Sequence, residues 1–213
     1  MTRKTSKAGG AATRLMSHFK TLGSATGAGS VRIVAGQWRG RRIPFLLAPG
    51  LRPTPDRIRE TLFNWLQREV VDRRCLDLYA GSGALGFEAL SRGAAAAVLV
   101  ERDAGVAQTL TAAAAALGAT QAQIVRADAQ AYLAGPVTPF DLVFLDPPFA
   151  LGALTELCTL LEVRGWLTPA ALIYLEQAAR DVPPTLPENW RLIKETRAGE
   201  VRAVLARRGD GTP

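Results

Sequence analysis

The sequence has 213 residues, of which 48% are hydrophobic and 21% charged, as is typical of a soluble globular protein. No apolar run approaches the roughly 20 residues that span a bilayer, and the N-terminus lacks the compact apolar segment of a secretory signal. The two cysteines, Cys75 and Cys158, lack metal-ligand spacing and are predicted to be reduced thiols. We therefore expect a cytoplasmic protein, monomeric, without a membrane partner or a metal.

The net charge of +7 is unevenly distributed. Residues 1–59 contain 12 Lys and Arg against one acid, giving +11, whereas residues 60–213 contain 14 against 18 acids, giving −4. A basic segment of this kind favours contact with nucleic-acid phosphates, because binding releases condensed counterions. The alternative is a solubilising tail with a solvated face.

Residues 1–30 are rich in Gly, Ala, Ser and basic residues and contain no acid, which predicts a disordered basic tail. A transit peptide is the alternative for this segment. Residues 31–50 are predicted to form an N-terminal β-hairpin that contacts RNA, and residues 51–213 the main domain.

The hairpin contains one tryptophan among several arginines. Trp38 is predicted to stack on a base while the arginines contact phosphates; alternatively, its ring folds back onto the core. The four arginines are Arg32, Arg39, Arg41 and Arg42.

The stretch LRPTPDRIRETLFNWL (51–66) is predicted to be a helix, with Thr54 as N-cap and Pro55 at the first helical position. Its apolar residues recur at helical spacing and predict a buried face; they are Ile58, Leu62, Phe63, Trp65 and Leu66. Arg52, Thr54 and Arg57 crowd the entrance of this helix, where polar groups can meet a ligand.

From residue 75 onward, strand patterns alternate with helix patterns, which predicts βαβ units and a mostly parallel α/β sheet covered on both faces. An antiparallel pair is expected after residue 190. The predicted strands are 75–79, 97–101, 123–128, 141–146 and 171–176, and a helix is predicted at about 154–163.

Four consecutive predicted strands carry an acid at or near their ends: Asp77, Glu101, Asp128 and Asp146. In an open α/β sheet, ligands bind beyond the carboxyl ends of the strands. Each acid alone could be a helix cap or a solvated side chain. Their shared position predicts a ligand site at this edge.

The loop AGSGALG (80–86) follows the first of these strands and opens a helix. Gly81 and Gly83 allow close approach of a ligand to the backbone. A dinucleotide pyrophosphate suits a helix N-terminus, but the carboxylate of Asp77 favours a cationic ligand such as S-adenosylmethionine. Glu101 is then placed to accept from ribose hydroxyls, and Asp128 from the adenine amine.

The segment DLVFLDPPFA (141–150) ends a hydrophobic strand on an acid and continues with two prolines and a ring. The Asp146 carboxylate and the Pro147 carbonyl are predicted to accept both hydrogens of an exocyclic amine. Pro148 stiffens the backbone, and Phe149 stacks on an extruded base. The one histidine, His18, lies in the tail, which argues against a Ser-His-Asp triad and most zinc chemistry.

These motifs resemble those of class I S-adenosylmethionine-dependent methyltransferases that modify base amines. VRIVAGQWRGRRIPF, LRPTPDRIRETLFNWL, CLDLYAGSGALGFEALSRGA and FLDPPF together resemble, more narrowly, the bacterial 16S rRNA guanine-N2 methyltransferases.

The resemblance covers about residues 31–206 and implies a Rossmann-like, seven-stranded, mostly parallel sheet. It also implies methylation of the N2 amine of guanine 966 in 16S rRNA, with a small-subunit particle as the partner. The implied catalytic motif is Asp146, Pro147, Pro148 and Phe149. The implied cofactor-binding residues are Thr54, Asp77, Tyr79, Gly81, Ser82, Gly83, Glu101, Arg102, Asp128 and Ala129.

Two other functions stay open at this point. A DNA amino-methyltransferase uses a similar Asp-Pro-Pro-aromatic motif, but the chain has no spare 60–100 residues (roughly) for a target-recognition region. A non-catalytic RNA-binding assembly factor could use the same scaffold, although binding alone does not require the carboxylate of Asp146. A dinucleotide-dependent oxidoreductase lacks a catalytic donor and a second domain.

Overall fold

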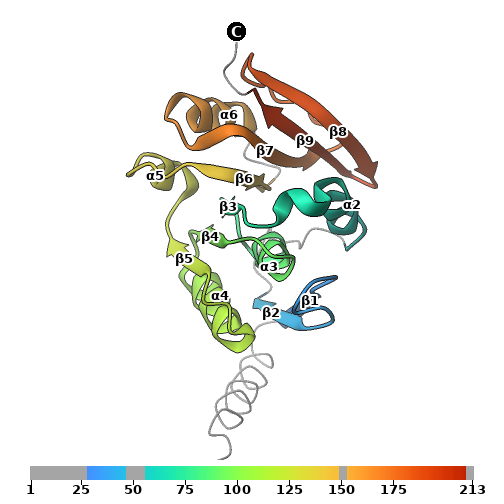
Figure 1. The fold of residues 1–213 in the computed structure, drawn as a ribbon, viewed down its shortest axis with the longest axis vertical. Coiled ribbons are helices and arrows are strands. Elements are labelled where there is room, and N and C mark those ends of the chain that lie inside the picture. The colour runs from blue at the N-terminus through green and yellow to red at the C-terminus, as the bar shows by residue number, and fades with distance from the viewer. Residues whose placement is uncertain (1–27, 47–55, 149–152, 210–213) are drawn as a thin grey trace, which may run out of the picture.

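The structure, a computed structural model, describes residues 28–46, 56–148 and 153–209 (Figure 1). Seven strands form one sheet in the order β5-β4-β3-β6-β7-β9-β8. Strands β3 to β7 run parallel, and β9 runs antiparallel to both β7 and β8. The strands are β3 (Arg74–Asp77), β4 (Ala96–Glu101), β5 (Ala122–Arg126), β6 (Phe140–Leu145), β7 (Leu167–Ala178), β8 (Trp190–Ala198) and β9 (Val201–Arg208). The predicted class of fold is confirmed.

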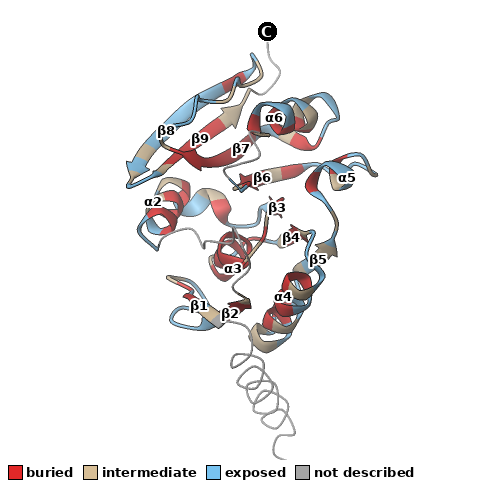
Figure 2. Ribbon diagram, turned by 180° about the vertical axis from the view of Figure 1, so that it is seen from behind, coloured by how far each residue is buried: buried red, intermediate tan, exposed pale blue. Residues whose placement is uncertain are grey.

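Helices cover both faces of this sheet. One face packs against α2, α3 and α4 together with a separate two-stranded hairpin, and the other against α5 and α6. The bounds are α2 (Asp56–Leu66), η1 (Gln67–Val70), α3 (Ala84–Ser91), α4 (Ala104–Leu117), α5 (Ala129–Leu133) and α6 (Leu154–Val163). Figure 2 shows the buried residues along the central strands and the inner helix faces, whereas most of β8 is exposed. Among the described residues, no helix is long and apolar enough to cross a membrane.

Several predicted boundaries differ from the structure. The helix at 154–163 is confirmed, but β7 extends beyond both ends of the predicted strand, because Leu167 pairs with β6 at its start and Gln177 and Ala178 pair with β9 at its end. Thr54, Pro55 and Arg52 lie outside the described residues, so the predicted N-cap is not described. Trp65 is only partly buried, while Arg59 takes a place in the buried face of α2.

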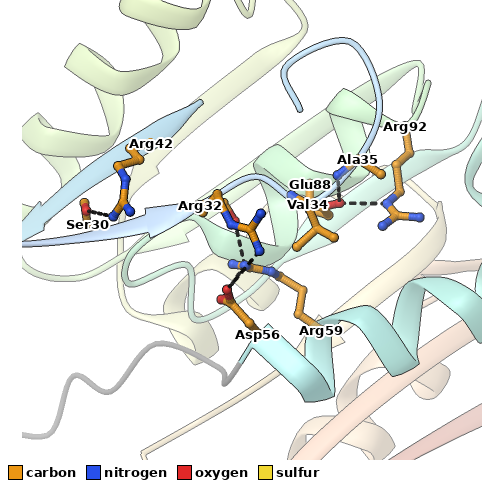
Figure 3. Close-up of polar contacts among 9 residues, drawn as sticks. All are labelled: Ser30, Arg32, Val34, Ala35, Arg42, Asp56, Arg59, Glu88 and Arg92. Atoms are coloured by element: carbon orange, nitrogen blue, oxygen red, sulfur yellow. Dashed lines mark hydrogen bonds and ion pairs between the residues drawn. The ribbon is translucent and has the colours of Figure 1, made fainter. Parts of the chain in front are cut away.

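The hairpin consists of β1 (Ala28–Arg32) and β2 (Arg42–Leu46) and begins inside the predicted tail. Its connecting segment is fixed to α3 by backbone groups. The amides of Val34 and Ala35 donate to the fully buried carboxylate of Glu88, at 2.8 and 3.0 Å. The Arg92 guanidinium also donates to this carboxylate, at 2.8 Å (Figure 3). A buried charge is stable when it is paired and hydrogen-bonded, so Glu88 joins the hairpin to the main domain.

A second buried charge lies between the hairpin and α2. Arg59 is 1% exposed, and its Nη2 donates to the Arg32 carbonyl at 2.6 Å and to the Asp56 carboxylate at 2.7 Å (Figure 3). Burial lowers the pKa of Arg59, against the opposing charges of Asp56 and Glu88. The guanidinium therefore ties the start of α2 to the end of β1.

Candidate active site

Three of the predicted acids gather at the carboxyl edge of neighbouring strands. Asp77 ends β3, Glu101 ends β4, and Asp146 directly follows β6. Asp77 is paired in register with Leu99 of β4 and Phe144 of β6, so Glu101 and Asp146 each lie two residues further along their strands. Side chains two residues apart on a strand point to the same face. The three carboxylates therefore face the same side of the sheet as the hairpin.

Asp77 is the most deeply placed of these acids. It is 2% exposed and accepts a hydrogen bond from the Gly86 amide at 3.1 Å. Burial raises its pKa to about 7, and the charges of Asp146 and Glu101 act in the same direction, opposed by backbone hydrogen bonds from Gly86 and Tyr79. Within the described residues, Asp77 forms no ion pair with a basic side chain. A positively charged ligand would relieve this cost, because an opposite charge favours the ionised acid.

Hydrogen bonds to Asp77 and Glu101 hold the two ends of the glycine loop, residues 80–86. The Gly81 amide donates to one oxygen of Glu101 at 3.0 Å, and the Asp103 amide donates to the other at 2.8 Å. Gly83 has a φ of +74°, and a Cβ there would lie 2.6 Å from Phe87 and 2.7 Å from Leu110. Only glycine fits this conformation without strain. Ser82, which lies between Gly81 and Gly83 and is one of the predicted cofactor-binding residues, is buried.

The predicted adenine end of the site contains Asp128. Its Oδ1 accepts from the amides of Gln130 at 2.9 Å and Ala131 at 3.3 Å, so it is the N-cap of α5. Burial raises the pKa of Tyr79 to about 12, with the charge of Asp128 adding to this rise and that of Arg102 opposing it. These three side chains therefore lie near one another. Capping was the alternative role foreseen for such an acid, and cofactor binding by Asp128 remains a prediction.

The first three residues of the predicted catalytic motif directly follow β6. Asp146 is half-buried, Pro147 is buried and Pro148 is exposed. Both prolines line a hollow of about 260 Å³, together with residues from the start of α6, the end of β7 and the segment 181–185. Phe149 lies outside the described residues, so its predicted stacking role remains a prediction. In the described ranges, no group of three or more His, Cys, Asp or Glu is arranged to hold a metal ion.

Sequence reasoning missed one acid at this edge. Glu176, near the end of β7, is 3% exposed and lines the same hollow. The signal was available, because the predicted strand ALIYLE (171–176) also ends on an acid. Its neighbour Tyr174 donates a hydrogen bond to Glu176 at 2.7 Å.

The basic hairpin presents exposed arginines beside this domain. Arg41 donates to the Ala116 carbonyl at the end of α4, and Arg42 donates to Ser30 across the hairpin (Figure 3 shows the second contact). Arg32 is half exposed, and Arg39 and Arg57 are exposed.

Trp38 is a correction to the predicted RNA contacts. Its residue is 8% exposed and belongs to the core cluster, and its amide donates to Ser91 at 3.0 Å. A buried ring cannot stack on a base, so the alternative interpretation, a ring folded onto the core, is the one observed.

Comparisons with known proteins agree with this arrangement. The family described as "Conserved hypothetical protein 95" matches residues 31–207. The chain is 52% identical over 183 residues to the Ribosomal RNA small subunit methyltransferase D of Escherichia coli K12, covering 86% of this chain and 92% of the relative. The relative of that name from Haemophilus influenzae is 45% identical over 187 residues, covering 86% and 96%.

Two solved structures share the fold of this chain. A putative methyltransferase from Escherichia coli, yhhF, matches with a TM-score of 0.80 and 49% identity, covering 85% of this chain and 99% of that one. The Thermus thermophilus 16S rRNA N2 G1207 methyltransferase, solved with AdoMet and guanosine, shares the fold at a TM-score of 0.57 and 24% identity, covering 85% and 50%. This chain belongs to the Conserved hypothetical protein 95 family and is a homologue of the proteins named ribosomal RNA small subunit methyltransferase D.

Proposed function

We propose that this protein transfers a methyl group from S-adenosylmethionine to the exocyclic N2 amine of guanine 966 in 16S rRNA, within a small-subunit particle. The observation that carries the proposal is the row of carboxylates around a glycine loop, directly beside Asp146-Pro147-Pro148. The relatives named small subunit methyltransferase D support rRNA as the substrate class.

The cofactor half of the site comprises Asp77, Glu101 and the loop between them. S-adenosylmethionine supplies an electrophilic methyl group on a sulfonium and also carries an α-ammonium. The buried carboxylate of Asp77 fits this cationic group, because a nearby positive charge lowers the pKa that burial has raised. Glu101, already hydrogen-bonded by Gly81 and Asp103, would accept from the ribose hydroxyls.

The transfer half of the site comprises Asp146 and the prolines after it. A guanine amine is a weak nucleophile, because its lone pair is delocalised into the ring. Two acceptors that hold its hydrogens, the Asp146 carboxylate and the Pro147 carbonyl, would orient the lone pair toward the methyl group. The carboxylate would also stabilise the positive charge that develops on nitrogen as the N–C bond forms and the S–C bond breaks, which would leave S-adenosylhomocysteine, and it would accept the proton that the methylated amine loses. No histidine is needed for this chemistry.

The RNA would lie across the exposed arginines of the hairpin. Arg32, Arg39 and Arg42 extend from the same small sheet and its connecting segment, on a chain whose first 59 residues carry a charge of +11. Such contacts would fix the position of the RNA without reading its sequence. The choice of base would then be made at the strand edge.

The proposal is tested with small subunits that lack the modification, labelled S-adenosylmethionine and the purified protein. After digestion, we expect label in N2-methylguanosine at one position. Label in duplex DNA but not in subunits would favour a DNA amino-methyltransferase. Retained cofactor binding without transfer to either substrate would favour a non-catalytic binding factor.

A further inference from the structure

Glu176 lies level with the catalytic acid. Strands β6 and β7 are parallel neighbours with Leu145 paired to Leu175, so Asp146 and Glu176 are the next residues on the two strands. The edge that contains Glu101, Asp77 and Asp146 therefore extends one strand further, to β7.

The Tyr174 hydroxyl group binds one of these carboxylates and is influenced by the charge of the other. Tyr174 Oη donates to Glu176 Oε2 at 2.7 Å. Burial raises the pKa of Tyr174 well above its ordinary value, and the charges of Glu176 and Asp146 add to this effect. Because the Tyr174 hydroxyl senses both charges, the two acids lie on one face of the sheet, close to each other.

Two adjacent carboxylates place several hydrogen-bond acceptors at this edge. Glu176 is 3% exposed, and its carboxylate accepts the hydrogen bond from Tyr174. A tyrosine hydroxyl needs only one acceptor, which a neutral side chain could provide. A carboxylate can accept several hydrogen bonds at once, so the Tyr174 contact is compatible with a further donor from a ligand. Two adjacent acids therefore fit a ligand edge that presents adjacent donors.

The hollow beside Glu176 has walls that could hold a flat ring. Its lining includes Pro147, Pro148 and the segment 181–185. Gln177 fixes that segment, since its side-chain amide donates to the carbonyls of Asp181 at 3.1 Å and Val182 at 3.2 Å. The acceptor groups and the hollow thus belong to one rigid edge of the sheet.

Guanine presents two adjacent donors, the N1–H and the N2 amine, on its Watson–Crick edge. Adenine instead presents an acceptor at N1, which a carboxylate would repel. We infer that Glu176 is a specificity-determining residue, which accepts the N1–H of the target guanine while Asp146 and Pro147 hold the N2 amine. This inference rests on the proposed function and names how its site selects guanine.

The test compares two substrates, of which only guanosine has an N1–H and a 6-oxygen, and the change of their ratio on Glu176→Gln isolates the contact to N1. Subunits are reconstituted with RNA that carries either guanosine or 2-aminopurine riboside at the target position. The second base keeps the 2-amino group but has an acceptor at N1. We expect wild-type kcat/KM to favour guanosine by about 100-fold or more, because a buried acceptor is left without its donor.

Glu176→Gln can turn its amide toward N1 while its oxygen keeps the Tyr174 bond. The preference for guanosine should then fall by about 10-fold or more, with part of the change due to faster methylation of 2-aminopurine. Glu156→Gln, on the exposed side of α6, is the matched control and should keep the wild-type ratio. If Glu176→Gln does not fold, Tyr174→Phe provides the second variant and should lower the ratio in the same direction.

The outcomes separate this inference from the proposed function. A wild-type protein that methylates guanosine, with the same substrate ratio in Glu176→Gln, would overturn the role of Glu176 and leave the proposed function intact. A wild-type protein that methylates neither base would overturn both. Cofactor affinity, measured on each variant, should stay unchanged, because Asp77 and Glu101 are not altered.

Discussion

Two buried acids near α3 show how differently one protein can use a carboxylate. Glu88 receives two backbone amides from the hairpin and a guanidinium from Arg92, so its charge is paired within the chain. Asp77, at the strand edge, is held by backbone amides and forms no ion pair with any described basic residue. Its pKa is raised to about 7. The fold therefore provides the charged partner of the structural acid, whereas the partner that we propose for Asp77 is the cationic group of the cofactor.

The largest effect is expected at the transfer half of the edge. Asp146→Ala should lower kcat by about 10³-fold, because it removes an acceptor that acts on the amine in the transition state. Cofactor affinity should stay within a few-fold of wild type. Single-turnover transfer and calorimetric binding measure the two quantities. Retained turnover would remove Asp146 from the mechanism.

A second effect is expected where the segment between β1 and β2 packs against the end of α3, because Gly36 leaves no room there for a methyl group. A Cβ at Gly36, where φ is +83°, would lie 1.8 Å from the Ser91 carbonyl oxygen. Gly36→Ala should therefore lower the free energy of unfolding by about 3 kcal/mol. Gly40→Ala is the control, since its φ is +81° but nothing lies within 4 Å; it should cost about 1 kcal/mol. Equal losses in denaturant titrations would mean that the hairpin is not held through this contact.

Neutralising the two buried acids should change stability in opposite directions. Glu88→Gln should destabilise the protein by about 2 kcal/mol, because it weakens a charge-paired network. Asp77→Asn should stabilise the cofactor-free protein at about pH 8, by about 2 kcal/mol, since it removes a buried charge that pairs with no described basic side chain. The same variant should bind S-adenosylmethionine more weakly.

The pH dependence gives a further check of this pair. Because the folded-state pKa of Asp77 is raised, the folded protein holds a proton that the unfolded chain has lost between about pH 4 and pH 7. Stability of the cofactor-free protein should therefore fall as pH rises through this window, and Asp77→Asn should flatten the fall. Denaturant titrations across the window that give parallel curves would contradict the assignment.

The smallest effect is expected at the exposed arginines. Replacing Arg39, Arg41 and Arg42 with Glu should weaken RNA binding by about 10-fold at low salt and reduce the salt dependence of binding, because phosphate contacts are lost. Replacing Arg191, Lys194 and Arg197, three exposed residues of β8, with Glu makes the same change in net charge and is the control. Binding titrations at several salt concentrations that give an unchanged slope would mean that the hairpin faces away from the RNA.

The meeting of the acids at one strand edge was easier to predict from the sequence than the attachments around it. Strand-end acids such as Asp77 and Asp146 follow local patterns that alternate regularly along the chain, so their meeting at one edge could be anticipated. The partners of Glu88 lie 53 and 54 residues away, in a hairpin whose docking no local pattern encodes. Trp38 belongs to the same docking, and its burial depends on Ser91 of α3.

The most direct test of a cation-accepting edge is proton release on cofactor binding. Calorimetry of S-adenosylmethionine binding at about pH 6.5, in two buffers of different ionisation enthalpy, counts the protons exchanged. The account predicts that wild type releases between about a half and one proton more than Asp77→Asn, and that this difference disappears above about pH 8. Equal proton exchange by the two proteins at both pH values would contradict it.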